Sequence, residues 1–223
     1  MAPNNSGTLA DRVTDELRQA ILAHEFKPGD RLAATALAER FAVSATPLRE
    51  AFARLAGEGW VSYLPQRGVR VAEVSIAEME EIYELRTLLE PMAIRRSVAA
   101  GDDDWRGQVE QAFRRMQEAG GERVADLDGR EYAAYEELHV EFHKSTLRCC
   151  GSAWLLRVTD LLTDQSRRFR RLSLPIRAEY GPVAGEHRTI MQSCLDGDEE
   201  AAAAAILSHM DNTRRAILHW AQH

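Results

Sequence analysis

The sequence predicts a mainly α-helical protein in two parts, residues 1–74 and residues 75–223. Three observations lead to this fold class. Apolar residues recur at helical spacing through most of the chain, two strand-like runs lie close together within residues 61–71, and almost nothing after Ser75 alternates as a strand does. We therefore expect three helices and a small β-hairpin in the first part, and an antiparallel bundle of about six helices in the second.

Two helices are predicted before residue 42. The first runs from Leu9 to Phe26 and ends at the turn signal formed by residues 27–30, which include Pro28 and Gly29. Its apolar stripe consists of Val13, Leu17, Ala20 and Ile21. The second helix is short, from about Thr35 to Phe41, and its inward residues are Leu37 and Ala38.

A third helix is predicted within residues 43–55. Ser44 or Thr46 can cap it, and Pro47 fits a first turn whose N–H groups have no partner within the helix. Its apolar face consists of Leu48, Ala51, Phe52 and Leu55. The opposite face carries Ala45, Thr46, Arg49 and Arg54. A capped N-terminus with small polar and arginine side chains is the arrangement of a DNA recognition helix.

Two short strands follow the third helix. The runs Val61–Leu64 and Val69–Val71 are joined by Pro65-Gln66-Arg67-Gly68, which predicts a hairpin with Arg67 and Gly68 at its tip. Helix, helix, recognition helix and hairpin, in this order and at this close spacing, predict a winged helix-turn-helix DNA-binding domain over residues 1–74.

The same residues resemble a known family. The segments that carry the resemblance are residues 28–32 (Pro-Gly-Asp-Arg-Leu), 37–41 (Leu-Ala-Glu-Arg-Phe), 43–44, 46–51 (Thr-Pro-Leu-Arg-Glu-Ala) and 67–68. They are similar to the DNA-binding domain of GntR-type bacterial transcription regulators, and the 46–51 form is similar to the FadR subfamily. The chain has Ala45 where family members usually have arginine, and Ala34 and Ala36 where acidic residues are common. The operator sequence of relatives therefore does not carry over.

Composition and charge agree with a soluble two-domain regulator. The chain has 223 residues, of which 45% are hydrophobic and 28% charged, and no apolar run approaches the length of a membrane span. The N-terminus lacks a signal-peptide pattern, so we expect a cytoplasmic protein without a membrane partner. Residues 1–74 contain nine Lys or Arg and nine Asp or Glu, so residues 75–223 hold all of the net charge of −7. We therefore expect DNA contact in the first domain alone.

The three cysteines do not have metal-ligand spacing. Cys149, Cys150 and Cys194 are odd in number, which favours reduced, partly buried thiols. The alternative is a redox-sensing role for the adjacent pair Cys149 and Cys150.

The second part is predicted to consist of consecutive helices. Ser75 to Glu78 has capping-box spacing and opens a helix to about Ala100. Its broad apolar stripe consists of Met79, Ile82, Tyr83, Leu85, Leu88, Leu89 and Met92. Further helices are predicted over 104–119, 130–149, 153–172, 183–195 and 199–222.

Four histidines in this part are candidate metal ligands. His139 and His143 lie four residues apart, so both imidazoles project from one helix face, and His187 and His209 lie on the last two helices. Taken alone, the first pair could equally be solvated or hydrogen-bonded side chains. His24, His219 and His223 fit no pattern and are expected at the surface.

The resemblance extends to this part of the chain. Residues 84–90 (Glu-Leu-Arg-Thr-Leu-Leu-Glu) resemble the opening helix of the all-helical ligand-binding domain of the FadR subfamily. That domain often binds a divalent metal through an Asp-x-x-Phe-His pair and two later histidines, which implies His139, His143, His187 and His209 as ligands here. His139 stands where the aspartate is usual. Because nitrogen donors favour zinc or nickel over manganese or magnesium, we expect zinc, with nickel as the alternative.

Several charged residues allow two interpretations. Arg86 and Glu90 lie four apart and form either a surface ion pair or a site where Arg86 binds the carboxylate of an effector that also reaches the metal. Glu136 is either a metal ligand or a solvated charge. Most of the closely spaced arginines are expected in solvent: Arg167, Arg168, Arg170 and Arg171.

The sequence thus predicts a homodimeric, metal-containing transcription regulator, more a repressor than an activator, that binds a double-stranded operator of pseudo-palindromic sequence. A small organic acid would control it from the helical domain, which would also hold the dimer together. The alternatives are a pure metal sensor and a metal-dependent hydrolase or lyase. The chain has no catalytic triad, phosphate loop or paired acids, so we expect it not to be an enzyme.

Overall fold

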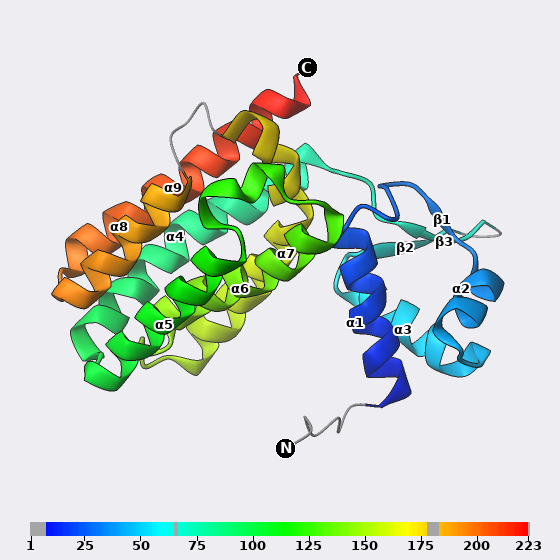
Figure 1. The fold of residues 1–223 in the computed structure, drawn as a ribbon, viewed down its shortest axis with the longest axis horizontal. Helices are drawn as coiled ribbons and strands as arrows, with labels where there is room; N and C mark the ends of the chain where they lie inside the picture. The colour runs from blue at the N-terminus through cyan, green and yellow to red at the C-terminus, as the bar shows by residue number, and fades with distance from the viewer. Residues whose placement is uncertain (1–7, 65–66, 178–182, 223) are drawn as a thin grey trace. The chain divides into compact units, whose positions relative to one another are not determined.

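The computed structural model describes residues 8–64, 67–177 and 183–222. The chain forms two compact units, Met1–Val74 and Ser75–His223 (Figure 1). Both are dominated by helices, and the first also contains a small antiparallel sheet, so the expected fold class is confirmed. None of the described helices is long and apolar enough to cross a membrane.

The first unit is built around α1 and α3. Its elements are α1 (Leu9–Leu22), β1 (Arg31–Leu32), α2 (Ala34–Phe41), α3 (Ala45–Gly57), β2 (Val61–Leu64) and β3 (Gly68–Val71). Helix α1 begins in a capping box between Thr8 and Asp11 and packs on α3 through a buried apolar core. It ends at Leu22, four residues before the predicted end at Phe26, because His24 turns the chain with a left-handed φ of 58°.

The sheet has three strands rather than the two expected. The strand order is β1-β3-β2, and Arg31 and Leu32 of β1 pair with Arg70 and Val69 of β3. Gly29 makes the turn into β1 possible: its φ is +82°, and a Cβ there would lie 2.6 Å from Glu73 Oε1. Pro65 and Gln66, predicted for the hairpin turn, lie outside the described residues, as does His223.

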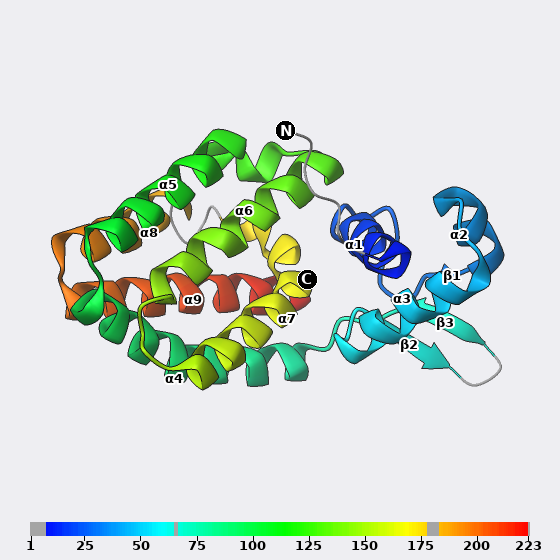
Figure 2. The same ribbon diagram turned by 90° about the horizontal axis from the view of Figure 1, so that it is seen from below.

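The second unit is a bundle of long helices (Figure 2). Its elements are α4 (Ile76–Ala100), α5 (Asp103–Ala119), η1 (Gly121–Asp126), α6 (Gly129–Leu147), α7 (Ala153–Arg177), α8 (Val183–Asp196) and α9 (Glu199–Ala221). Helices α5, α6, α8 and α9 begin and end within two residues of the predicted bounds. Helix α7 continues to Arg177, five residues beyond the predicted end at 172, and the 3-10 helix η1 was not predicted.

Helix α4 exposes part of its predicted apolar stripe. Met79 and Tyr83 are buried as expected, but Leu85, Leu88 and Met92 are exposed. The buried face instead includes Arg86, Glu90 and Ser97, whose polar atoms face the interior of the bundle. Because α4 carries apolar residues on two faces, its sequence pattern does not reveal which face is inside.

Candidate functional site

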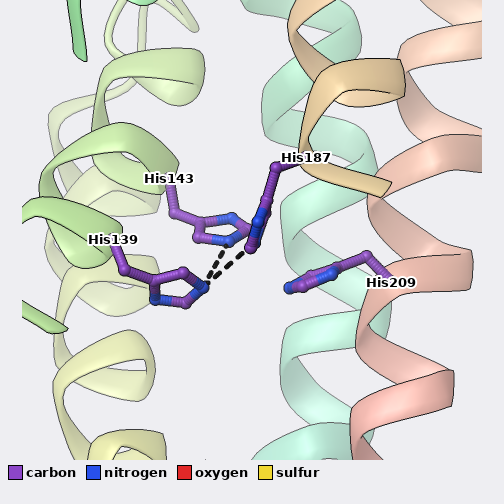
Figure 3. A group of neighbouring side chains, drawn as sticks. All are labelled: His139, His143, His187 and His209. Atoms are coloured by element: carbon purple, nitrogen blue, oxygen red, sulfur yellow. Dashed lines mark hydrogen bonds between the residues drawn. The ribbon is translucent and has the colours of Figure 1, made fainter. Parts of the chain in front are cut away.

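Four histidines from three helices converge inside the bundle (Figure 3). His139 and His143 project from one face of α6, His187 comes from α8 and His209 from α9. All four are buried, with exposed fractions between 0% and 5%. The structure therefore brings together every histidine that the sequence analysis selected as a ligand.

The imidazole nitrogens have a spacing that suits one metal ion. The Nε2 atom of His139 lies 3.1 Å from that of His187 and 3.2 Å from that of His143. One candidate ligand atom from each of the four histidines can be chosen so that all lie within 4.8 Å of one another. Nitrogen ligands about 2.0–2.1 Å from one zinc ion lie about 3.0–3.4 Å apart, and the distances from His139 to His143 and to His187 fall in this range. The four histidines could therefore hold a metal ion.

Burial keeps these imidazoles in the neutral form that binds metals. The pKa values of His139, His143 and His187 are lowered well below the usual 6.5, chiefly because burial disfavours the charged ring and then because cationic neighbours repel it. Burial also lowers the pKa of His209, although Glu186 acts in the opposite direction. At neutral pH each ring therefore presents a lone pair.

Glu186 orients His209 from the side away from the cluster. The His209 Nδ1 atom lies 2.8 Å from Glu186 Oε2, which leaves the Nε2 atom of this ring for a metal. Asn212 and Arg177 also donate hydrogen bonds to the Glu186 carboxylate. Among the described residues, the Nδ1 atoms of His139, His143 and His187 have no hydrogen-bond partner.

Arg86 and Glu90 form a buried pair. The Arg86 Nε atom donates to Glu90 Oε1 at 2.6 Å, and its Nη1 donates to Ser166 Oγ at 2.9 Å. Only 3% of the Arg86 side chain and none of the Glu90 side chain is exposed. The surface ion-pair interpretation is therefore wrong, and the inward-facing Arg86 already has a carboxylate partner within its own helix.

Glu136 and two of the arginines expected in solvent are also buried. Arg170 donates to Glu136 through Nε at 2.8 Å, and Tyr132 donates to the same carboxylate at 3.3 Å. Arg167 is buried as well and pairs with Glu137. The expectation of solvated side chains was wrong for Glu136, Arg167 and Arg170 because their charges neutralise one another inside the bundle. Arg168 and Arg171 are partly exposed.

A small cavity of about 30 Å³ adjoins the histidines. Its wall is formed by residues of α6, α7 and α9, with Val124 and Val183 beside them. The polar residues of this wall include His139, His209, Arg170 and Arg177. Sequence analysis missed Arg177, because it ended this helix at residue 172; no motif marks this arginine.

The remaining histidines and the cysteines lie outside this cluster. His24 is exposed and His219 partly exposed, as expected of surface residues. Burial raises the pKa of the Cys149 thiol, and raises that of Cys194 to about 12. Because the thiolate is the reactive form, the shift at Cys149 disfavours the redox-sensing alternative for the pair Cys149 and Cys150.

The candidate DNA interface lies at the start of α3 and at the end of the hairpin. Ser44 occupies the N-cap position without a side-chain capping bond, and Thr46 and Arg49 are exposed in the first turns. Arg54 is also exposed, but it pairs with Asp11 of α1, and this contact lowers the Asp11 pKa to about 2. At the hairpin, Arg67 and Gly68 are exposed, and Gly68 has a φ of +79°.

Both units match known protein families. Residues 9–71 match the family described as "Bacterial regulatory proteins, gntR family", and residues 81–212 match the FCD domain. The chain belongs to the GntR family. Its FCD domain follows the GntR domain in the FadR-like order, so the resemblance found in the sequence is confirmed.

Relatives and solved structures agree with this GntR–FCD assignment. The chain is 29% identical to the "Uncharacterized HTH-type transcriptional regulator BphR" of Paraburkholderia xenovorans, over 94% of this chain and 85% of that protein. It is 27% identical to the "HTH-type transcriptional repressor GlaR" of Escherichia coli, over 87% of this chain and 89% of that protein. A putative GntR regulator from Rhodococcus sp. RHA1 has the same fold, with a TM-score of 0.76 and 23% identity. The match covers 94% of this chain and 97% of that structure.

The GntR–FCD chain is therefore a DNA-binding transcription regulator. The GntR family and the relatives named above are regulators and not enzymes, which confirms the expectation of no enzymatic activity. The hydrolase or lyase alternative is accordingly set aside.

Proposed function

We propose that this GntR regulator is a cytoplasmic repressor whose affinity for its operator is controlled by a small organic acid bound at a metal centre in the FCD domain. The observation that carries the proposal is the cluster of four buried, neutral histidines in a domain that follows a DNA-binding domain in the sequence. Repression is supported by the relative GlaR, which is named a repressor.

The donor set favours zinc, with nickel as the alternative. Four neutral nitrogen ligands supply no charge to compensate a divalent ion. The nearby carboxylates do not supply it either, because Glu90, Glu136 and Glu186 are already paired with Arg86, Arg170 and Arg177. The metal, when bound, would polarise an oxygen atom of an acid. An anionic effector is therefore the ligand class that balances the charge of the buried site.

Operator contact is assigned to Ser44, Thr46 and Arg49 at the start of α3 and to Arg67 and Gly68 at the hairpin. Their exposure supports this assignment, and no ion pair is recorded for Arg49 or Arg67 within the described part of the chain. Arg54 is a weaker candidate because Asp11 neutralises it. A free guanidinium near a helix N-terminus suits both phosphate and guanine contacts.

Homodimerisation is assigned to the exposed apolar face of α4 and α7, which are in contact with each other. This apolar face consists of Leu85, Leu88, Met92, Trp154, Val158 and Leu161. Leu88 and Trp154 are 67% and 73% exposed, values that are unusual for two large apolar side chains on neighbouring helices.

A second copy of the chain fits this face. Exposed Glu81 and Glu84 lie on α4, and exposed Arg157 lies beside Trp154 on α7, so the face carries charges of both signs for an isologous contact. Two-fold symmetry also supplies the two recognition helices that a pseudo-palindromic operator requires. The acid would act by favouring one of two arrangements of the dimer, which changes operator affinity.

The test combines metal analysis with operator binding. Purified protein is expected to contain about one metal ion per chain. In gel-shift titrations, a small acid should weaken the binding of zinc-loaded protein to DNA from its own promoter region, and the amide of that acid should have no effect. Protein that binds no metal after incubation with zinc contradicts the metal centre. Release of DNA by zinc alone, with no response to any acid, would identify a pure metal sensor instead.

A further inference from the structure

The cavity beside His139 contains two unused hydrogen-bond donors. Among the residues of its wall, the described structure records two buried polar atoms without a hydrogen-bond partner, His139 Nδ1 and Arg177 Nη1. Arg177 is only 2% exposed, and its other donors are occupied: Nε bonds Thr213 at 3.3 Å and Nη2 bonds Glu186. A buried guanidinium nitrogen without an acceptor is costly, so this wall favours a ligand that brings one.

The His139 Nδ1 atom would be a donor when Nε2 of the same ring binds the metal. Its Nε2 atom points toward the Nε2 atoms of His143 and His187, where it would bind the metal (Figure 3). A neutral imidazole that coordinates through Nε2 carries its proton on Nδ1. The distance from His139 Nδ1 to the carboxylate oxygen Glu136 Oε2 is 3.8 Å, which is too long for a hydrogen bond.

Both unused groups therefore require acceptors, and the carboxylates nearby are already engaged. Glu136 accepts from Arg170 and Tyr132, and Glu186 accepts from His209, Asn212 and Arg177. Arg86, by contrast, is a poor anchor for a ligand because Glu90 and Ser166 already accept from it.

We propose that the cavity is an anion subsite in which Arg177 Nη1 and His139 Nδ1 bind one carboxylate group of the effector. The assignment rests on the proposed control by an acid, and it replaces Arg86 with Arg177 as the anchor. A volume of about 30 Å³ is more than one water molecule requires and leaves room for a small group such as one carboxylate. Arg177 is then the residue that distinguishes acids from neutral analogues.

The experiment measures binding of acetate, a small carboxylate probe, to full-length zinc-loaded protein by calorimetry and thermal shift. Acetamide, which has no charge, is the matched control ligand. We compare wild type with Arg177→Met and with Arg177→Lys, which keeps a charge beside Glu186 if the methionine variant fails to fold. Arg168→Met is the control variant, because Arg168 lies on the same helix outside the cavity wall.

Wild type and Arg168→Met are expected to bind acetate alike and to bind acetamide much more weakly. Both Arg177 variants should weaken acetate binding about tenfold or more. Acetate binding is compared at full zinc occupancy, because Arg177 also donates to Glu186, which orients His209. Unchanged acetate affinity in Arg177→Lys and Arg177→Met, or no acetate binding by wild type, overturns the subsite. Operator binding and zinc content of the wild type, measured in parallel, report on the proposed function separately from the acetate measurement.

Discussion

At the scale of single residues, the partner of each arginine decides its role. Arg49 and Arg54 lie on the same helix and are both exposed, but Asp11 pairs with Arg54 alone. Within the bundle, Arg86 and Arg177 are equally buried, but only Arg177 has an unpartnered nitrogen. All four residues are arginines, so their ion-pair and hydrogen-bond partners decide which of them can bind DNA or a ligand.

Arg49→Ala is expected to weaken specific operator binding by about 1–3 kcal/mol, because it removes a free guanidinium from the start of the recognition helix. Arg54→Ala should weaken it less, since Asp11 already neutralises this side chain. Gel-shift titrations of both variants against one promoter fragment provide the measurement, and circular dichroism checks the fold. Equal losses in the two variants would contradict the assignment of Arg49 as the main contact.

His143→Ala is expected to abolish stoichiometric metal binding, because it removes one of the four proposed ligands. The loss should extend to any acid response in the gel shift, while the metal-free variant still binds DNA. His219→Ala is the control, since His219 lies outside the cluster. Metal content equal to wild type in His143→Ala, measured by elemental analysis after dialysis, would remove this residue from the ligand set.

At the scale of elements, α6 is the scaffold of the site. A capping box between Asp128 and Glu131 begins this helix, and its spacing places His139 and His143 one turn apart on the buried face. Helices α8 and α9 complete the cluster from the opposite side (Figure 3). Burial on these three helices also makes the metal-free bundle sensitive to acid.

Metal-free protein is expected to lose stability as the pH falls below about 6.5, the ordinary pKa of an unfolded histidine. The folded-state pKa values of His139, His143 and His187 lie well below that value, chiefly because of burial. The unfolded chain therefore binds more protons in this range, and each histidine removes at most about 1.4 kcal/mol per pH unit. Urea unfolding of chelator-treated protein at about pH 7.5 and about pH 5.5 tests whether the free energy of unfolding is lower at the lower pH. A flat profile would mean that the rings are not buried in the neutral form.

At the scale of the whole molecule, the proposed dimer contact is the exposed apolar face of α4 and α7. Leu88→Glu should convert a dimer into a monomer, because it would bury a charge in the proposed contact, and operator affinity should fall with it. Leu207→Glu is the matched control, since Leu207 is 43% exposed on α9 outside this face. Light scattering of both variants measures the mass. A Leu88→Glu protein that remains dimeric contradicts the assignment.

Local signals in the sequence were sufficient for most of the elements, and together with the family resemblance they selected the four histidines that the structure brings together. Helical periodicity and capping residues located the long helices, and the spacing of His139 and His143 placed both on one helix face. These features depend on neighbours within a few residues, so they can be read before the chain folds. Strand β1 was missed because it contains two residues and forms only by pairing with β3, which lies nearly forty residues away.

Tertiary structure alone decided which faces are inside and which charges are paired. Periodicity on α4 did not reveal that Leu88 is exposed and Arg86 buried, because burial depends on where α7 and α9 pack. Arg170 was expected in solvent, yet Glu136 of another helix neutralises it inside the bundle. The sequence by itself determined a winged helix-turn-helix joined to a helical domain with four suitable histidines. Their convergence, and the unused donor of Arg177 beside them, required the packing of segments far apart in the chain.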